Sequence, residues 1–392
     1  WGNFFGGDCW EYDDLRGEYY LHLFAKEQPD LNYHNEAVIE AIEEAMHFWL
    51  ERGVAGFRCD VINIIYKEAI KNGKWRPALT GSEYYLSTPG CHRVLHRLHE
   101  DVLAKYDAFT VGETVFVTPK MADDLVNPAR EELSTVFAFE HMETDCYKIK
   151  WFLRRFNPDC FFACLTKWQK ALPWNTVYLE NHDQPRSVSR FGNDTQYHDE
   201  SAKALATLVL TLRGTPFLYE GQEIGMTNFD FPDMQKVRDV ESINIWNIGK
   251  RLHLPRSLRW RMIKTKSRDN ARTPMQWNDS PNAGFTTGTP WLSVNGNYPR
   301  INVAEQENAP NSVLAYYRQL IAFRNGSEIL QAGDFSELYR KDGVYAYRRS
   351  LNVESLIVVI SLSTKERPNP VSGTVVLSNY GRQESPACLS PY

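Results

Sequence analysis

The chain has 392 residues, of which 44 are basic and 49 acidic, so its formal net charge is −5. This balance argues against nucleic acid or an anionic membrane as the main partner, and no stretch approaches the ~18–20 apolar residues of a membrane span. A length of this order accommodates two or three domains of roughly 100–200 residues each. Trp, Tyr and Phe make up 13% of the chain. Such flat apolar faces suit stacking on sugar rings, and they suit the filling of a large core equally well.

The cysteines and clustered histidines give no sign of a metal or a disulfide framework. The chain has seven scattered cysteines and no CxxC or Cys/His zinc spacing, which is typical of reduced core thiols and of a cytoplasmic protein. His92, His96 and His99 share one predicted helix, and a solvated or half-buried helix face explains them better than metal binding. We therefore expect no metal and no cofactor. The cysteines are Cys9, Cys59, Cys91, Cys146, Cys160, Cys164 and Cys388.

From about residue 35, amphipathic helices alternate with short apolar strands, which is the pattern of a parallel, helix-covered sheet or barrel. The first helix has Asn35 as a plausible N-cap and Gly53 as its stop. The predicted helices are 35–52, 92–105, 160–171, 201–213 and 312–324, and the predicted strands are 54–61, 108–113, 134–141, 175–183 and 215–221.

After Asn325 the pattern changes to short β-runs separated by turn residues. These runs are DFSELY, VYAYRRSL, SLIVVISLS and GTVVLSN. We therefore expect 326–392 to form a separate small antiparallel β domain. The stretch 278–310 keeps many aromatic residues and is predicted to be a long ordered loop.

Three acidic residues, Asp60, Glu113 and Asp183, stand at or next to the carboxyl ends of predicted parallel strands. In barrels of alternating strands and helices, the active site is assembled at that rim. A single acid at this rim often caps the next helix. Three acids at the ends of three different strands are hard to explain as caps.

Cleavage of a glycosidic bond needs one carboxylate at the anomeric carbon and one protonated carboxyl at the leaving oxygen. Arg58 is two residues before Asp60 on the same strand face, so its guanidinium is expected to hold Asp60 ionised. Glu113 has apolar neighbours, which are expected to raise its pKa and keep it protonated. His182 and Asp183 together offer hydrogen-bonding groups for adjacent sugar hydroxyls.

The motifs GFRCDVIN, FTVGE and ENHDQPR resemble three conserved regions of the α-amylase family of glycoside hydrolases, in the same order. QPDLN, FAFEH, GTPFLYEGQEIGMTN and RDNARTPMQW further resemble its oligo-1,6-glucosidase branch, which includes dextran glucosidases and isomaltases. The resemblance extends over essentially the whole chain.

The resemblance implies a role for each matching residue. Asp60 becomes the nucleophile, Glu113 the general acid/base and Asp183 the carboxylate that distorts and stabilises the sugar in the transition state. Substrate-binding roles are implied for the residues around them. These are Arg58 and His182 beside the non-reducing glucose, Arg268 at its 4-hydroxyl with Arg272 as a weaker candidate, Glu140 as either a pocket or a supporting residue, and Val61 at the pocket wall.

Val61 also carries linkage information in this branch, where enzymes that cut α-1,6 bonds usually have Val and α-1,4 maltases usually have Thr. The alternative is that Val61 is simply a good strand residue, and the two interpretations have equal weight. Val115 departs from the Trp that some dextran glucosidases have two residues after the acid/base. This departure favours short isomalto-oligosaccharides over long dextrans.

The resemblance implies an α/β fold, a (β/α)8 TIM-type barrel lacking its first three strands, with a C-terminal antiparallel β domain. Strands one to three have no counterpart before Trp1. We therefore expect a fragment that is inactive alone, with the missing N-terminal segment of the same enzyme as a partner. The expected domains are a remnant of the domain inserted after strand three (1–28), a partial catalytic barrel with strands four to eight (29–325) and a C-terminal β-sandwich (326–392).

The expected function is that of a retaining, exo-acting α-glucosidase that cleaves α-1,6 bonds at the non-reducing end of short isomalto-oligosaccharides. A small oligosaccharide is then the expected partner. Within the class, the alternatives are a trehalose-6-phosphate hydrolase, an α-1,4-glucosidase or a sucrose isomerase. Outside it, the alternative is a non-catalytic glycosidase-like module that binds another protein.

Overall fold

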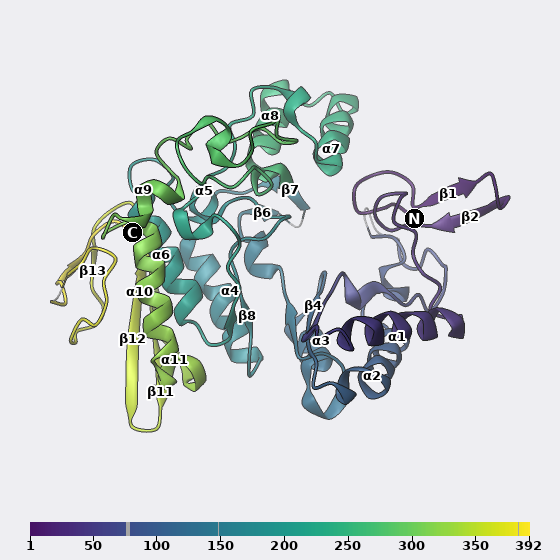
Figure 1. Cartoon of the computed structure of the whole chain (residues 1–392), viewed down its shortest axis with the longest axis horizontal. Coiled ribbons are helices and arrows are strands. Elements are labelled where there is room, and N and C mark those ends of the chain that lie inside the picture. The colour runs from purple at the N-terminus through teal and green to yellow at the C-terminus, as the bar shows by residue number, and fades with distance from the viewer. Residues whose placement is uncertain (76–78, 148, 383) are drawn as a thin grey trace. The chain divides into compact units, whose positions relative to one another are not determined.

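A computed structural model describes residues 1–75, 79–147, 149–382 and 384–392 (Figure 1). Its contacts divide the chain into two compact units. The first, here called the N-terminal unit, comprises Trp1–Glu140 and Ala171–Thr176. The second, the C-terminal unit, comprises His141–Lys170 and Val177–Tyr392. The expected domain boundaries at residues 28 and 325 stay predictions.

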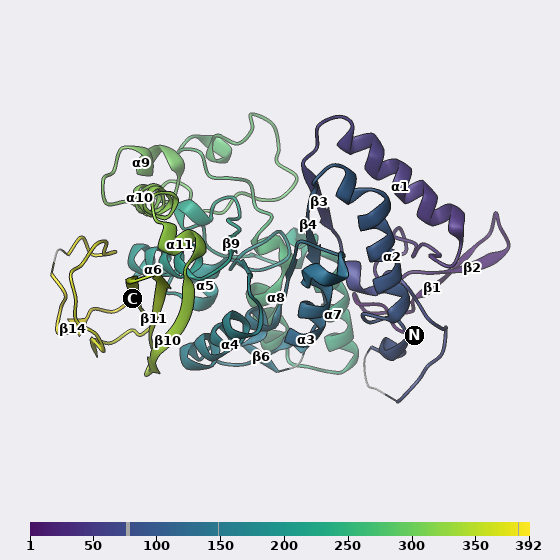
Figure 2. The ribbon, with the colours of Figure 1, turned by 90° about the horizontal axis from the view of Figure 1, so that it is seen from below.

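The N-terminal unit contains a three-stranded parallel sheet with the strand order β3-β4-β5. The chain alternates between helices and these strands, as the sequence pattern predicts, and Figure 2 shows α1 and α2 beside β3 and β4. An antiparallel hairpin of β1 and β2 precedes them. The elements are β1 (Trp10–Asp13), β2 (Glu18–Leu21), α1 (Glu36–Leu50), β3 (Gly56–Cys59), α2 (Pro89–Asp101), β4 (Phe109–Glu113), α3 (Pro119–Val126) and β5 (Thr135–Phe137).

The first two helices begin where the sequence supplies caps. The side chain of Asn35 accepts a hydrogen bond from the amide of Ala37 at the start of α1. The side chain of Thr88 caps α2 in the same way, and Pro89 occupies the first helical position, where no amide proton is needed. Ile39 of α1 packs with Val94 and Leu98 of α2, so the two helices share an apolar core.

Gly56 allows β3 and β4 to pair closely. A Cβ atom at this position would lie 1.8 Å from the carbonyl oxygen of Phe109, the residue with which Gly56 is in register. Any side chain here would push the two strands apart. Since β3 leads into Asp60 and β4 ends at Glu113, this close pairing also fixes the spacing of the two candidate acids.

The C-terminal unit is mainly helical, with one three-stranded antiparallel sheet and several short strand pairs. Its central packing joins α6 to α10, where Ala206 and Leu210 lie in one core with Tyr317 and Leu320. Every helix within the described residues is too short or too polar to cross a bilayer. The helices are α4 (Pro158–Ala171), α5 (Ser187–Phe191), α6 (His198–Thr211), α7 (Val240–Arg251), α8 (Arg256–Lys266), α9 (Val303–Glu307), α10 (Val313–Asn325) and α11 (Glu328–Ala332). The strands are β6 (Cys146–Tyr147), β7 (Ile149–Leu153), β8 (Thr176–Val177), β9 (Thr215–Pro216), β10 (Asp334–Lys341), β11 (Val344–Leu351), β12 (Glu354–Ser361), β13 (Arg367–Pro368) and β14 (Cys388–Leu389).

The end of the chain carries the predicted antiparallel sheet, in the order β10-β11-β12. Two buried tyrosines of β11 attach it to the helices, since the Tyr345 hydroxyl bonds with Thr166 of α4 (2.8 Å) and the Tyr347 hydroxyl with Thr211 of α6 (2.5 Å). The sheet is therefore continuous with the helical core of its unit.

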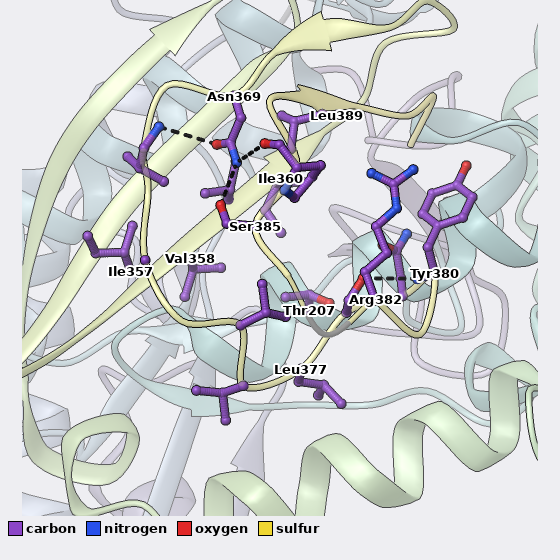
Figure 3. A pocket seen from close by; sticks show the side chains of 18 of the residues that line it. Thr207, Ile357, Val358, Ile360, Asn369, Leu377, Tyr380, Arg382, Ser385 and Leu389 are labelled. Atoms are coloured by element: carbon purple, nitrogen blue, oxygen red, sulfur yellow. Dashed lines mark hydrogen bonds between the residues drawn. The ribbon is translucent and has the colours of Figure 1, made fainter.

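The strand predicted at GTVVLSN is wrong, because residues 373–379 form no strand in the structure. They belong to the loop between β13 and β14, which the antiparallel pairing of these two strands closes. Beside this pairing, the Asn369 side chain donates to the Pro386 carbonyl (3.0 Å) and to the Ser385 hydroxyl (3.2 Å). This loop and β12 line a cavity of about 550 Å³ (Figure 3).

The strands predicted at 134–141 and 175–183 are present, but both are shorter than predicted. The strand expected over 134–141 is only β5, and the one expected over 175–183 is only β8. The residues that follow each strand have left the ladder. Asp183, predicted at a strand end, therefore lies on the loop after β8, whereas Glu113 is still the last residue of β4.

Candidate active site

Asp60 and Glu113 come together at the carboxyl end of the parallel sheet. Asp60 is the first residue after β3, and Glu113 is the last residue of β4. The Arg58 Nη1 atom donates to Asp60 Oδ1 at 2.8 Å, and its Nη2 atom donates to Glu113 Oε2. One guanidinium therefore bridges the two carboxylates, which places them side by side.

This bridge differs from the expected division of roles, in which Arg58 serves Asp60 alone. Since Arg58 contacts both acids, it does not by itself distinguish a charged nucleophile from a neutral acid. Their exposure does differ, because the Asp60 side chain is 62% exposed and the Glu113 side chain only 12%. Glu113 is thus sheltered beside buried Val111, whereas Asp60 is open to an incoming ligand.

Val61 is not a strand residue, although the sequence predicted a strand through position 61. The strand β3 ends at Cys59, and Val61 adopts a left-handed backbone conformation with φ 42° and ψ 38°. A β-branched residue is strained in that region, and such strain is concentrated at functional sites. The interpretation of Val61 as a good strand residue is therefore wrong, and its role in linkage selection stays a prediction.

Asn63 joins the loop after Asp60 to the loop after Glu113. It is fully buried, and its Nδ2 atom donates to the Val115 carbonyl (2.9 Å) while its Oδ1 atom accepts from the Val115 amide (3.0 Å). This two-bond clamp fixes the loop segments that carry the two acids. Asn63 is not among the predicted site residues, and its signal in the sequence is its place three positions after Asp60 in GFRCDVIN.

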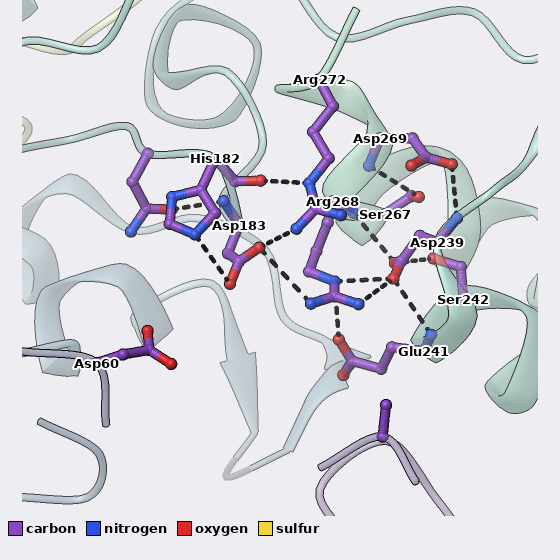
Figure 4. A network of polar contacts seen from close by, with 12 residues as sticks. Asp60, His182, Asp183, Asp239, Glu241, Ser242, Ser267, Arg268, Asp269 and Arg272 are labelled. Atoms are coloured by element: carbon purple, nitrogen blue, oxygen red, sulfur yellow. Dashed lines mark hydrogen bonds and ion pairs between the residues drawn. The ribbon is translucent and has the colours of Figure 1, made fainter. Parts of the chain in front are cut away.

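In the C-terminal unit, Asp183 is surrounded by His182, Arg268 and Arg272 (Figure 4). The Arg272 Nη2 atom bonds to Asp183 Oδ1, and its Nε atom donates to the His182 carbonyl at 2.8 Å. Arg268 is more distant, with its Nη1 atom 3.6 Å from Asp183 Oδ1. The His182 ring nitrogen Nε2 lies 3.7 Å from the other Asp183 oxygen.

Arg268 is bound mainly by Asp239, an acid that is not among the predicted site residues. Its Nε atom donates to Asp239 Oδ1 at 2.8 Å, and its Nη2 atom lies 2.7 Å from the same oxygen. Burial lowers the pKa of Arg268, but the charge of Asp239 outweighs it, so the pKa lies above its ordinary value. Burial raises the pKa of Asp239, and the charge of Arg268 brings it below its usual range. The pair is thus charged and largely enclosed.

The Asp239 carboxylate is itself positioned by its neighbours. The Ser242 hydroxyl donates to Asp239 Oδ2 at 2.6 Å, and Asp239 accepts from the Glu241 amide as the N-cap of α7. Asp269 accepts from the amides of Arg238 (2.6 Å) and Asp239 (2.9 Å). Asp239 looks like an ordinary helix cap in sequence, so nothing there linked it to Arg268.

Glu140 lies in the N-terminal unit as the first residue of a 3-10 turn, Glu140–Glu143, and is exposed. Among the described residues, no group of three or more His, Cys, Asp or Glu side chains could hold a metal ion. Two of the three predicted helix histidines have other partners, since His92 pairs with Glu132 (2.6 Å) and His96 bonds to the Arg130 carbonyl (2.9 Å).

Residues 1–333 match the family described as the α-amylase catalytic domain. The chain belongs to the α-amylase family. Among its relatives, the oligo-1,6-glucosidase of Parageobacillus thermoglucosidasius is 46% identical over 376 residues, which are 93% of this chain and 67% of that protein. The predicted family membership is thus confirmed.

Two solved structures of α-amylase family enzymes are also similar to this chain. The trehalose-6-phosphate hydrolase of Bacillus licheniformis matches with a TM-score of 0.92 at 39% identity, covering all of this chain and 74% of that one. The isomaltulose synthase of Klebsiella sp. LX3 matches with a TM-score of 0.94 at 35% identity, covering all of this chain and 73% of that one. The α-amylase barrel fold with a C-terminal antiparallel sheet is therefore confirmed, and the expected lack of three strands stays a prediction.

Proposed function

We propose that this α-amylase family chain is a retaining, exo-acting α-glucosidase that hydrolyses α-1,6 bonds at the non-reducing end of short isomalto-oligosaccharides. The observation that carries the proposal is the pair of adjacent carboxylates, Asp60 and Glu113, bridged by Arg58 at the rim of a parallel sheet. The 46% identity to an oligo-1,6-glucosidase supports the linkage.

The first step is the transfer of the glucosyl group to the protein. An Asp60 carboxylate oxygen attacks the anomeric carbon while Glu113 gives its proton to the glycosidic oxygen, so the bond to the leaving sugar breaks. The exposure of Asp60 and the sheltered position of Glu113 fit these roles. Glu113 enters this step protonated, and Arg58 then continues to stabilise the charge on Asp60.

In the second step, the Glu113 carboxylate removes a proton from water, whose oxygen attacks the same carbon and releases Asp60. Two successive displacements at one carbon restore its configuration. An α-linked substrate therefore releases α-glucose first.

We assign the glucose contacts of the C-terminal unit to His182, Asp183 and Arg272, with Arg268 behind them. Arg272 is 27% exposed and contacts Asp183, whereas Arg268 is only 11% exposed and is bound to Asp239. This arrangement favours Arg272 over Arg268 as the residue that faces the sugar, which reverses the expected ranking.

The test is to incubate the purified chain with isomaltose, maltose, sucrose and trehalose 6-phosphate in parallel, and to follow released glucose by NMR. The proposal predicts preferential cleavage of isomaltose, with α-glucose as the first product. Such cleavage by the purified chain would also overturn the expectation that it is inactive without a further N-terminal segment. First release of β-glucose would contradict the retaining mechanism, and preference for maltose would contradict the role of Val61.

Trehalose-6-phosphate hydrolysis is the second candidate, because the solved enzyme with that activity matches this chain with a TM-score of 0.92. The identity to that enzyme is 39%, lower than the 46% to the oligo-1,6-glucosidase. A tenfold preference for trehalose 6-phosphate over isomaltose in the same assay would favour it.

We also propose a cytoplasmic location. All seven cysteines are free thiols in the structure, which fits a reducing compartment.

A further inference from the structure

Phe116 has a strained backbone and an exposed aromatic ring on the loop after Glu113. Its φ is 54°, in the left-handed region that bulky side chains rarely adopt, and 45% of the residue is exposed. Strain of this kind persists only where the surrounding structure imposes it.

Both neighbours of Phe116 are fixed. Val115 is held through its amide and its carbonyl by buried Asn63. Val117 is buried, and Thr118 then caps α3 by accepting from the Met121 amide at 3.3 Å. The chain thus places Phe116 between two anchored segments, and its side chain stays partly exposed.

The ring nevertheless has a firm support. It stacks on Phe4 with centroids 6.0 Å apart and planes inclined by 16°, and Phe4 stacks on Phe24 at 4.9 Å and 19°. The Phe4 amide donates to the Leu23 carbonyl at 2.8 Å, which anchors the middle ring. Phe116 is therefore the exposed end of a pre-formed stack of three rings.

This stack shares a hydrophobic cluster with the residues that follow the two candidate acids in sequence. Val61 and Val115 pack against the same cluster of Leu23, Ile64 and Tyr85 as Phe4 and Phe24 do. Phe116 is three positions after Glu113, so their Cα atoms lie at most about 11 Å apart. Glu113 protonates the leaving oxygen in the proposed function, so the sugar beyond that oxygen leaves on this side.

We propose that Phe116 is the stacking platform for the leaving-group glucose of the oligosaccharide, and so a specificity-determining residue. The proposal rests on the proposed function and extends it to the aglycone side of the site. The apolar face of a glucose ring would pack on the exposed phenyl face, and the strained backbone would hold that face in place before the ligand arrives.

The kinetic test compares Phe116→Gly with the unmodified chain on isomaltotriose and on α-glucosyl fluoride, whose leaving group is not a sugar. Glycine suits the left-handed backbone, so the variant is expected to keep or raise its Tm. We expect kcat/KM for isomaltotriose to fall about tenfold, mainly through KM, and kcat/KM for glucosyl fluoride to stay within twofold. Phe116→Tyr should retain most of the isomaltotriose activity. Equal losses on the two substrates, or no loss on either, would contradict the platform.

Phe48→Ala is the matched control. Phe48 is also an exposed phenylalanine of the N-terminal unit, at 46%, but it lies near the end of α1, which leads to the amino end of β3. Its removal should leave both substrates unaffected. An isomaltotriose defect as large as that of Phe116→Gly would show that loss of any exposed ring has this effect, which would overturn the assignment.

A binding measurement separates this proposal from the proposed function. In a Glu113→Gln background, calorimetric titration with isomaltotriose and with glucose needs no turnover. We expect Phe116→Gly to weaken isomaltotriose binding about tenfold and glucose binding less than twofold. Unchanged isomaltotriose binding, or no binding before the substitution, would overturn the platform whatever the chain hydrolyses. Failure to hydrolyse glucosyl fluoride, with this binding difference intact, would overturn only the hydrolytic function.

Discussion

Arg58 holds two carboxylates at once, and the chemical difference between them must therefore come from their surroundings. Glu113 is largely enclosed at the end of β4, while Asp60 lies on the loop after β3. Substitutions of the two acids should consequently differ in how strongly their effect on kcat/KM depends on the leaving group of the substrate.

We expect Glu113→Gln to lower kcat/KM for isomaltose by about 10²–10⁴-fold and to affect α-glucosyl fluoride much less, since fluoride departs without a proton. Asp60→Asn should abolish turnover of both substrates, because neither can form the glycosyl intermediate. Steady-state kinetics with the two substrates measures this contrast. Equal losses for Glu113→Gln on both would exclude Glu113 as the acid.

Asn63→Ala should destabilise the N-terminal unit, because the amide and carbonyl of Val115 lose their buried partners. Each buried polar group left unsatisfied costs about 1–3 kcal/mol, so we expect a loss of roughly 2–5 kcal/mol in the free energy of unfolding. Urea denaturation would measure it. Asn72→Ala, at an exposed position of the same unit, should change the value by less than about 0.5 kcal/mol.

Substitution of Arg272 should mainly reduce activity, whereas substitution of Arg268 should mainly reduce stability. Arg272→Ala removes a partly exposed contact to Asp183, so we expect kcat/KM to fall at least tenfold with little change in Tm. Arg268→Ala leaves Asp239 buried without its counter-ion, which typically costs about 3–5 kcal/mol. Thermal unfolding and kinetics on both variants would separate the roles. A stable, inactive Arg268→Ala would restore Arg268 as the sugar-facing residue.

At the scale of elements, one buried ion network joins α5, α8 and the residue before β6. Asp145 accepts two bonds from Arg190 of α5, both at 2.8 Å, and one from Lys266 of α8 at 2.6 Å. Burial raises the pKa of Asp145, but the charges and hydrogen bonds of Arg190 and Lys266 lower it to about 2. Since α8 ends two residues before Arg268, this network also positions the segment that carries the candidate arginines.

Asp145 should therefore determine part of the acid stability. Its folded pKa of about 2 lies below the ordinary value of about 3.9, so its stabilisation is present above pH ~4 and is lost as the pH falls towards 2. The shift corresponds to about 2–3 kcal/mol. Unfolding free energies measured between pH 2 and 6 should show this slope, and Asp145→Asn should remove it.

At neutral pH, Asp145→Asn should also cost about 3–5 kcal/mol, because two buried cations lose their counter-charge. Lys266→Met is the matched control, since Asp145 keeps both bonds from Arg190 and the loss should be smaller. Burial and the charge of Arg190 already lower the pKa of Lys266 to about 8, which indicates that its protonated form is costly to bury. A larger loss for Lys266→Met than for Asp145→Asn would contradict this account.

At the scale of the whole molecule, local sequence signals predict most helices and strands. They do not predict which distant residues contact one another. Capping residues such as Asn35 and Thr88 begin helices where the sequence predicts or nearly predicts them. The loop at 373–379 was mistaken for a strand because its β-branched residues have strand propensity but no neighbour to pair with.

The acids could be selected from sequence because they follow strands and form family motifs. Their partners depended on contacts between distant positions: Arg58 with Glu113 is a separation of 55 residues, and Arg268 with Asp239 one of 29. The left-handed backbones of Val61 and Phe116 also came from tertiary constraints, since neither residue favours that conformation alone.

The central claim is that Asp60 forms a covalent bond with the glucosyl group. Treatment of the chain with a fluorinated glucosyl fluoride, which forms a slowly hydrolysed intermediate, followed by peptide mass mapping, tests it most directly. We predict one added fluoroglucosyl group per chain, attached to Asp60 and absent from Asp60→Asn. Attachment to Glu113 or Asp183, or no adduct, would contradict the account.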